Sequence, residues 1–180
     1  REDFEQLIPP HNLEELVIGE FFGRGYPTWL GASHLSSMKH LYLVNCRSCV
    51  HLPSIGQLPN LKFLQIMGAT VVTKIGPEFL GCYVGSPGSA EAVGFPKLES
   101  LLIRQMPNWE EWSFVDEEQP AAGRLRVYDS FNLRCVEKMD NLQQLWLDED
   151  MQYTSSQWVP VLQRQHQQLH GDDLDVYTWA

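Results

Sequence analysis

A six-residue pattern, Leu-x-x-Leu-x-Leu with other aliphatic residues at some leucine positions, recurs along this chain of 180 residues. Clear copies begin at Leu13, Met38, Leu61, Leu98 and Leu142, and a degenerate copy begins at Ala122. In chain order, successive starts lie 25, 23, 37, 24 and 20 residues apart. Because self-similarity at a period of roughly 20–50 residues indicates stacked copies of one structural unit, the chain is predicted to form a solenoid.

Each copy of the pattern predicts a short β-strand, because side chains of an extended strand alternate between its two faces. The leucines of Leu-x-Leu then point inward, and the residues between them point outward. One unit cannot bury its apolar face alone, so neighbouring units stack into a continuous core. The predicted fold class is α/β: a leucine-rich-repeat solenoid, or horseshoe, with short parallel strands on the concave face, an irregular convex side and a C-terminal capping helix.

Residues 1–155 are predicted to be the leucine-rich-repeat domain, with about six repeats. The widest spacing, 37 residues, places a Gly- and Pro-rich loop insertion at 80–95, and residues 115–140 are expected to be irregular. Residues 156–180 are predicted to be a cap helix and an acidic tail. Within this part, Trp158, Leu162, His166 and Leu169 recur at helical spacing, and Gly171 follows as a stop signal.

The charge of the chain argues against partners that carry phosphate groups. The formal net charge is −10, and acidic residues gather in runs such as 116–118 and 148–150. A surface of this sign repels phosphate groups, so we expect no binding of nucleic acid and no docking on anionic lipid. Because no stretch approaches the ~20 apolar residues of a membrane span, no membrane insertion is expected either.

The compartment is predicted from two absences in the sequence. None of the six asparagines begins an Asn-x-Ser/Thr sequon, and the four cysteines have no regular spacing. Neither glycosylation nor a disulfide scaffold is therefore indicated. A reducing setting fits best, so we expect the cytoplasm, with the nucleus as an alternative.

Two motifs resemble metal sites but are expected to be structural. Cys46-x-x-Cys49 has no second ligand pair at zinc spacing, so Cys46 is expected to satisfy backbone groups of a turn as a small buried polar residue. His166 and His170 lie four residues apart on the expected helix, and we interpret them as a packed or solvent-facing pair. No motif of an enzyme is present, so we expect no enzymatic activity, no cofactor and no metal.

Trp109 and Trp112 flank two glutamates and leave two interpretations open. Both indoles could pack under a turn, which we favour, or they could form an aromatic binding edge.

The candidate binding site is the outward-facing row of the predicted strands. Tyr, Trp and Arg are favoured anchors of protein interfaces, and this row contains all three. The alternative is that another part of a parent protein covers the row intramolecularly. The predicted protein-binding residues on the concave face are Glu15, Val17, His40, Tyr42, Phe63, Gln65, Leu102, Arg104, Arg126, Tyr128, Trp146 and Asp148.

Several segments are more specific than the general leucine-rich-repeat pattern. They are Gly25-Tyr26-Pro27-Thr28-Trp29-Leu30, the run from Leu41 to Leu64 with its Ile55-Gly56-Gln57-Leu58-Pro59, Phe95-Pro96-Lys97-Leu98-Glu99, and Met106-Pro107-x-Trp109-Glu110-Glu111-Trp112. Together they resemble the leucine-rich-repeat region of plant nucleotide-binding disease resistance proteins of the coiled-coil type. The ending Leu169-His170-Gly171-Asp172-Asp173-Leu174 to Trp179 looks like the C-terminus of such a receptor from a grass.

The resemblance implies a role in plant innate immunity. In such receptors the repeats contact a pathogen effector, a guarded host protein or the receptor's own nucleotide-binding module, and they help to hold the receptor inactive. The nucleotide-binding module itself has no counterpart in this chain. A leucine-rich-repeat substrate adaptor of a ubiquitin ligase, or another protein-interaction scaffold, stays open as the alternative function.

Overall fold

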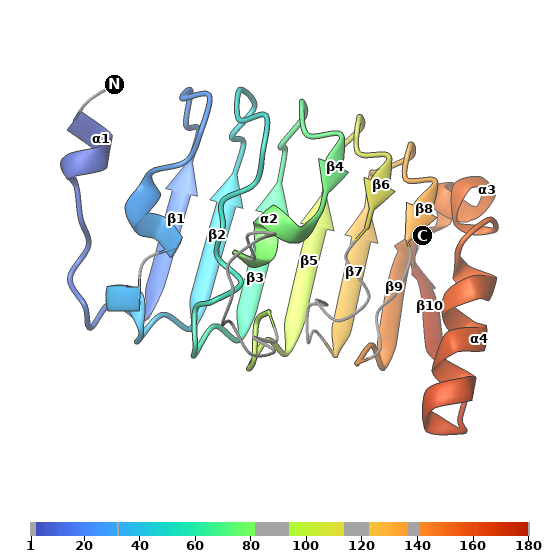
Figure 1. Ribbon diagram of the computed structural model, residues 1–180. Coiled ribbons are helices and arrows are strands. Elements are labelled where there is room, and N and C mark those ends of the chain that lie inside the picture. Colours follow the sequence, from blue (N-terminus) through green and yellow to red (C-terminus); the bar gives the residue numbers. More distant parts are fainter. Residues whose placement is uncertain (1–2, 32, 82–93, 114–122, 137–140, 180) are drawn as a thin grey trace.

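The computed structural model describes residues 3–31, 33–81, 94–113, 123–136 and 141–179 (Figure 1). Its main feature is a parallel sheet of seven strands in the order β1-β2-β3-β5-β7-β9-β10. The strands are β1 (Glu15–Gly19), β2 (His40–Val44), β3 (Phe63–Met67), β5 (Ser100–Arg104), β7 (Arg124–Tyr128), β9 (Gln144–Asp148) and β10 (Asp175–Trp179). The first six lie where the repeated pattern predicts them, which confirms the parallel strands and the repeat architecture.

The inward positions of the strands form continuous apolar lines across the sheet. Strand pairing places Leu16, Leu41, Leu64, Leu101, Leu125 and Leu145 next to one another in that order. Apart from Leu16 in the first strand, all of these leucines are buried. Each repeat therefore supplies one layer of a shared core, as expected for stacked units that bury no core alone.

A residue with left-handed backbone conformation follows five of the seven strands. Glu20, Asn45, Gly68, Gln105 and Asp129 all have φ between 50° and 69°. The first four donate their backbone N–H to the carbonyl of the last strand residue in the next repeat, at 2.7–3.1 Å. This turn redirects the chain out of the sheet at the same point in each repeat, so it fixes where the outward row ends.

A second, smaller sheet lies on the return segments. It consists of β4 (Lys74–Ile75), β6 (Glu111–Trp112) and β8 (Cys135–Val136), paired in parallel in that order (Figure 1). The return side was expected to be irregular, and that prediction is wrong for these segments. The expected irregular stretch 115–140 also contains the regular strand β7, because Leu125 and Val127 complete the apolar lines of the core.

Helices in the described residues are short, apart from one. They are α1 (Asp3–Gln6), 3-10 turns at Thr28–Gly31, Ser33–Leu35 and Glu149–Met151, α2 (Pro77–Leu80), α3 (Gln152–Ser155) and α4 (Val159–His170). The longest, α4, lies next to β10 at the C-terminal end (Figure 1). Its Leu162 joins the core cluster, and Gly171 ends it with φ 82°.

The acidic tail predicted for the end of the chain is wrong for residues 175–179. These residues form β10, which pairs with β9 so that Tyr177 faces Trp146 across the two strands. Two causes explain the difference: the edge of β9 offers a row of backbone hydrogen-bonding groups, and Val, Tyr, Thr and Trp favour extended strands. The acidic Asp172 and Asp173 remain in the turn before it.

The predicted insertion at 80–95 falls mostly on 82–93, outside the described residues. At its base, Phe79 and Phe95 are fully buried with ring centroids 5.0 Å apart. Gly56 lies against the same base, where a β-carbon would come within 2.5 Å of the Leu80 α-carbon. The backbone approach at this point therefore requires glycine.

Candidate functional site

All twelve residues predicted as the binding row lie on one face of the seven-stranded sheet. They occupy alternate positions in their strands, opposite the buried leucines, and none of them is fully buried. We call this surface the sheet face. Its central line, in strand order, is Val17, Tyr42, Gln65, Leu102, Arg126, Trp146 and Tyr177.

In the half of the sheet face nearer the N-terminus, apolar and aromatic side chains lie beside the polar Glu15, His40 and Gln65. Tyr42 and Phe63 contact each other with ring centroids 5.6 Å apart, in a tilted arrangement. Val17 is 59% exposed, and Leu102 is half-buried. Covering the apolar surface that Val17 exposes, and the smaller part that Tyr42 and Phe63 expose, would release free energy of roughly 25 cal/mol per Å².

The other half of the sheet face holds arginine and stacked aromatic rings. Trp146 and Tyr177 stack with ring centroids 4.3 Å apart and an interplanar angle of 19°. The guanidinium carbon of Arg126 lies 5.8 Å from the centre of the Trp146 ring, within range of a cation–π contact. The stack and the guanidinium together form a continuous surface across β7, β9 and β10.

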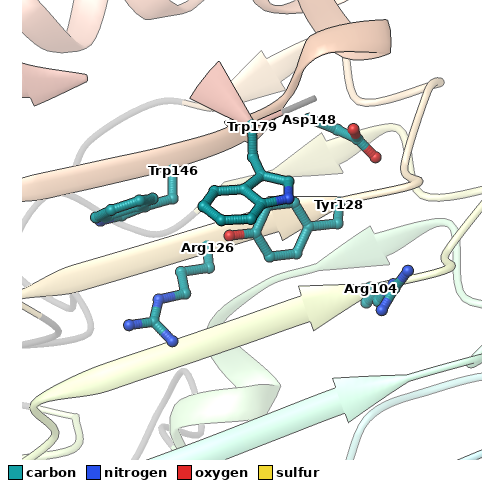
Figure 2. Close-up of a pocket in the computed structure, with 6 residues that line it drawn as sticks. All are labelled: Arg104, Arg126, Tyr128, Trp146, Asp148 and Trp179. Carbon is teal, nitrogen blue, oxygen red and sulfur yellow. The ribbon is translucent and has the colours of Figure 1, made fainter. Parts of the chain in front are cut away.

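A cavity of about 460 Å³ opens in this half of the sheet face. Figure 2 shows side chains from β5, β7, β9 and β10 surrounding it, with Trp179 drawn in front of the sheet. We call it the arginine–tryptophan cavity. Its lining residues are Arg104, Arg126, Tyr128, Trp146, Asp148 and Trp179.

The charged groups of the arginine–tryptophan cavity differ in their partners. The Nε of Arg104 donates to Asp129 Oδ2 at 3.0 Å, and Asp148 Oδ2 accepts the backbone N–H of Asp129 at 3.3 Å. Within the described part of the chain, the guanidinium of Arg126 has no carboxylate partner. Arg126 is therefore the cation of the cavity that no carboxylate of the described residues pairs with.

Two residues of this site were missed by the sequence prediction: Tyr177 and Trp179. The three aspartates that precede or begin this segment predict an acidic tail in place of a strand. The signal that could have identified them is the run Val176-Tyr177-Thr178-Trp179, in which aromatic and β-branched residues alternate after the apolar Leu174.

The Cys46-x-x-Cys49 motif is structural, as predicted. Both thiols are buried. The Cys46 thiol donates to the backbone carbonyls of Val44 and Ile18 at 3.7 and 3.8 Å, and the Cys49 thiol donates to that of Gly23 at 3.3 Å. Across the described ranges, no group of three His, Cys, Asp or Glu residues is arranged to hold a metal ion.

Burial raises the pKa of the Cys49 thiol from 9.0 to about 11, and the nearby Cys46 adds to the increase. The folded protein therefore keeps this proton where the unfolded chain loses it. The resulting stability is complete below about pH 9 and is lost as pH rises towards about 11.

We expect Cys49 to resist alkylation by iodoacetamide at about pH 8 in the folded protein, because the thiolate is the reactive form. Mass spectrometry of the Cys49 peptide measures this, with the urea-unfolded chain as the control. Equal alkylation rates in the folded and unfolded protein would contradict the buried placement.

The tryptophan pair of the sequence is core and not a binding edge. Trp109 and Trp112 are fully buried, with ring centroids 5.8 Å apart. The indole N–H of Trp109 donates to the Glu111 carbonyl at 2.9 Å. The packing interpretation is thus confirmed.

The rings of His166 and His170 contact each other with centroids 4.6 Å apart; His166 is buried and His170 is exposed. His166 is 8% exposed, and its Nε2 lies 3.1 Å from Asp172 Oδ1.

Among the helices that the structure describes, none has the length and apolar character needed to cross a bilayer.

Comparison with known proteins agrees with the repeat architecture. Residues 1–69 match the family model described as R13L1/DRL21 LRRs. Putative disease resistance RPP13-like protein 1 of Arabidopsis thaliana is 36% identical over 142 residues, which cover 76% of this chain and 13% of that protein.

Relatives from a second plant are more distant or cover less of the chain. Putative disease resistance protein RGA4 of Solanum bulbocastanum is 24% identical over 78% of this chain and 16% of its own length. Disease resistance protein RGA2 of the same species is 32% identical over 55% of this chain and 10% of its own length. The chain thus spans a small part of the proteins it matches, and an origin in grasses stays a prediction.

Proposed function

We propose that this chain, which belongs to the leucine-rich-repeat regions of plant disease resistance proteins, is a protein-recognition and regulatory module that binds through its sheet face. The observation that carries the proposal is the composition of that face. Strands β2, β3, β7, β9 and β10 hold Tyr42, Phe63, Arg126, Trp146 and Tyr177 on one surface, while the opposite side of the first four of these strands is buried core.

The partner proposed for the sheet face is a protein. Large aromatic side chains and arginine contribute most of the binding energy in protein interfaces when they become desolvated at the centre of the contact. The partner would be a pathogen effector, a guarded host protein or the nucleotide-binding module of the same receptor. Binding of an outside protein would then compete with an internal contact, which is one way to shift a receptor between two states.

The two ends of the solenoid are proposed to differ. The strands would line the concave side of a horseshoe, and α4 together with β10 would cap its C-terminal end. Leu162 of α4 and Leu174 before β10 are buried in the shared core, which supports this arrangement. Solenoids need such end units because the last repeat otherwise exposes its apolar side.

The proposed role is in plant defence and requires neither catalysis nor a cofactor. We place it in the cytoplasm, or in the nucleus as the alternative, because the sequence has no glycosylation sequon. The names of the relatives favour the receptor role over the ubiquitin-ligase adaptor role, since those reported above are disease resistance proteins.

Replacing Tyr42, Phe63 and Trp146 together with alanine is expected to lower recovery of the partner at least about tenfold, because truncating such anchors removes most of their contact area. The measurement is quantitative affinity purification from plant tissue with the purified chain, followed by mass spectrometry. In the parent receptor, the same variant is expected to change signalling in the absence of a pathogen.

The matched control is Val50→Ala, Tyr153→Ala and Val161→Ala, three exposed apolar or aromatic residues outside the sheet face. Circular dichroism checks that both variants are folded. The proposal is overturned if no captured protein depends on the sheet face and receptor signalling is also unchanged.

A further inference from the structure

We propose that the arginine–tryptophan cavity receives an acidic segment of the partner protein, with a carboxylate against Arg126 and a neighbouring apolar side chain against Trp146 and Trp179. This inference rests on the proposed function and specifies the chemistry of the partner at one end of the sheet face. It follows from the charges, the aromatic walls and the free donors of the cavity.

Arg126 is the residue of the cavity that can pair with a carboxylate of the ligand. Arg104 is already paired with Asp129, and the Asp148 carboxylate already accepts a backbone N–H. Arg126 alone has no carboxylate partner within the described ranges, and its guanidinium carbon lies 5.8 Å from the centre of the Trp146 ring. A guanidinium presents its N–H donors in a planar fork, which suits a carboxylate.

A second donor lies beside Arg126. Tyr128 is two residues further along β7 on the same face, and Figure 2 shows its hydroxyl directed towards the side of the cavity that holds Arg126 and Trp146. No hydrogen bond joins this hydroxyl to another group of the described residues. A carboxylate has two oxygens, so one could accept from Arg126 and the other from Tyr128.

The aromatic walls account for the apolar part of the ligand. Trp179 is 64% exposed and Tyr177 is 39% exposed, so the outer wall of the cavity is accessible. Trp146 is held in place by its stack on Tyr177, which lowers the entropy lost when a ligand binds. An extended segment that alternates an acidic and an apolar side chain would place both groups.

A carboxylate fits this cavity better than a phosphate. Asp148 in the lining and Asp129, the partner of Arg104, balance the charges of Arg104 and Arg126, so a dianionic phosphate would leave twice the excess negative charge that a carboxylate leaves. The net charge of −10 adds a repulsion that grows with the charge of the ligand. We therefore commit to an acidic protein segment and treat a phosphorylated peptide or a nucleic acid as outcomes of the test.

The test selects a display library of random linear peptides on the whole purified chain and on its Arg126→Gln variant. Peptides enriched by the parent chain are expected to be rich in Asp and Glu beside aromatic or aliphatic residues. A synthetic copy of the enriched peptide should lose about tenfold in affinity on Arg126→Gln, and about as much when its acids are replaced by Asn and Gln.

The matched control is Arg124→Gln. It removes the same charge from the same face of β7, but Arg124 already donates to Gln144 at 2.8 Å and does not line the cavity. Its effect on affinity should be less than about twofold, and circular dichroism shows whether each variant is folded. A phosphorylated form of the same peptide and a single-stranded oligonucleotide are measured alongside.

Enrichment of basic or uncharged peptides, absence of any enriched peptide, or tighter binding of the phosphopeptide or oligonucleotide would each overturn this inference. Equal losses in Arg126→Gln and Arg124→Gln would do the same. The proposed function has its own test, which is the alanine variant of Tyr42, Phe63 and Trp146 and the recovery of a natural partner. A partner whose recovery depends on those residues but not on Arg126 would remove only the present inference.

Discussion

Replacing Trp109 with alanine is expected to lower the free energy of unfolding by about 3–5 kcal/mol, the usual range for removing a buried tryptophan. The indole is fully buried against Trp112, and its N–H donates to the Glu111 carbonyl at 2.9 Å. Alanine would leave a cavity next to Trp112 and remove the donor that satisfies this carbonyl. Urea denaturation followed by far-ultraviolet circular dichroism gives the free energy directly.

Two further variants make this result interpretable. Trp109→Phe keeps one aromatic ring but loses the N–H and part of the bulk of the indole, so its cost should be smaller than that of alanine. Trp179→Ala removes an indole that is 64% exposed, and its cost should stay below about 1 kcal/mol. Similar costs for Trp109→Ala and Trp179→Ala would mean that Trp109 is not in the core.

The second large loss of stability is expected in strand β5, where the neighbouring residues Leu101 and Leu102 should respond differently to substitution. Leu101 points into the core and is fully buried, whereas Leu102 lies on the sheet face and is half-buried. Leu101→Ala should therefore cost about 2–5 kcal/mol, and Leu102→Ala less than about 1 kcal/mol. The same urea titration compares them, and the two substitutions remove the same atoms.

This pair tests the register of the strand directly. A shift by one residue moves every side chain of a strand to the opposite face, so an inverted register would exchange the two costs. A larger loss for Leu102→Ala than for Leu101→Ala would contradict the assignment of the sheet face. It would also remove Arg104 from that face, since Arg104 has the same parity as Leu102.

The strands were predictable because their signal is local and repeated. Leu61, Leu64 and Ile66 carry the same spacing as Leu13, Leu16 and Ile18, and the buried face requires leucine or a close substitute at each of these places. Even the degenerate copy with Leu125 and Val127 formed a strand in register. Membership of the sheet face follows from the same alternation, so its twelve residues were predictable too.

The features that could not be predicted from the sequence depend on contacts between distant parts of the chain. β10 has no copy of the repeat pattern, and it forms because the edge of β9 is available to it after α4 returns the chain. The arginine–tryptophan cavity needs Trp179 from that strand. Arg126 has no carboxylate partner among the described residues, and this likewise depends on the pairing of Arg104 with Asp129, which lie 25 residues apart.

The small second sheet had no clear local signal either. Its strands have two residues each, and only the stacking of repeats brings Ile75 and Trp112 side by side. A segment of that length carries no period from which a strand could be predicted.

Site-specific photo-crosslinking measures whether the sheet face is a protein-binding surface. A benzoylphenylalanine is placed at Gln65, in the middle of the sheet face, or at Val161, which is 40% exposed on α4. Each folded chain is irradiated in an extract of plant tissue. We predict a defined protein adduct at Gln65 that is absent at Val161 and is lost when Tyr42 and Phe63 are replaced with alanine. Adducts at Val161 alone, or the same adducts at both positions, would contradict the claim.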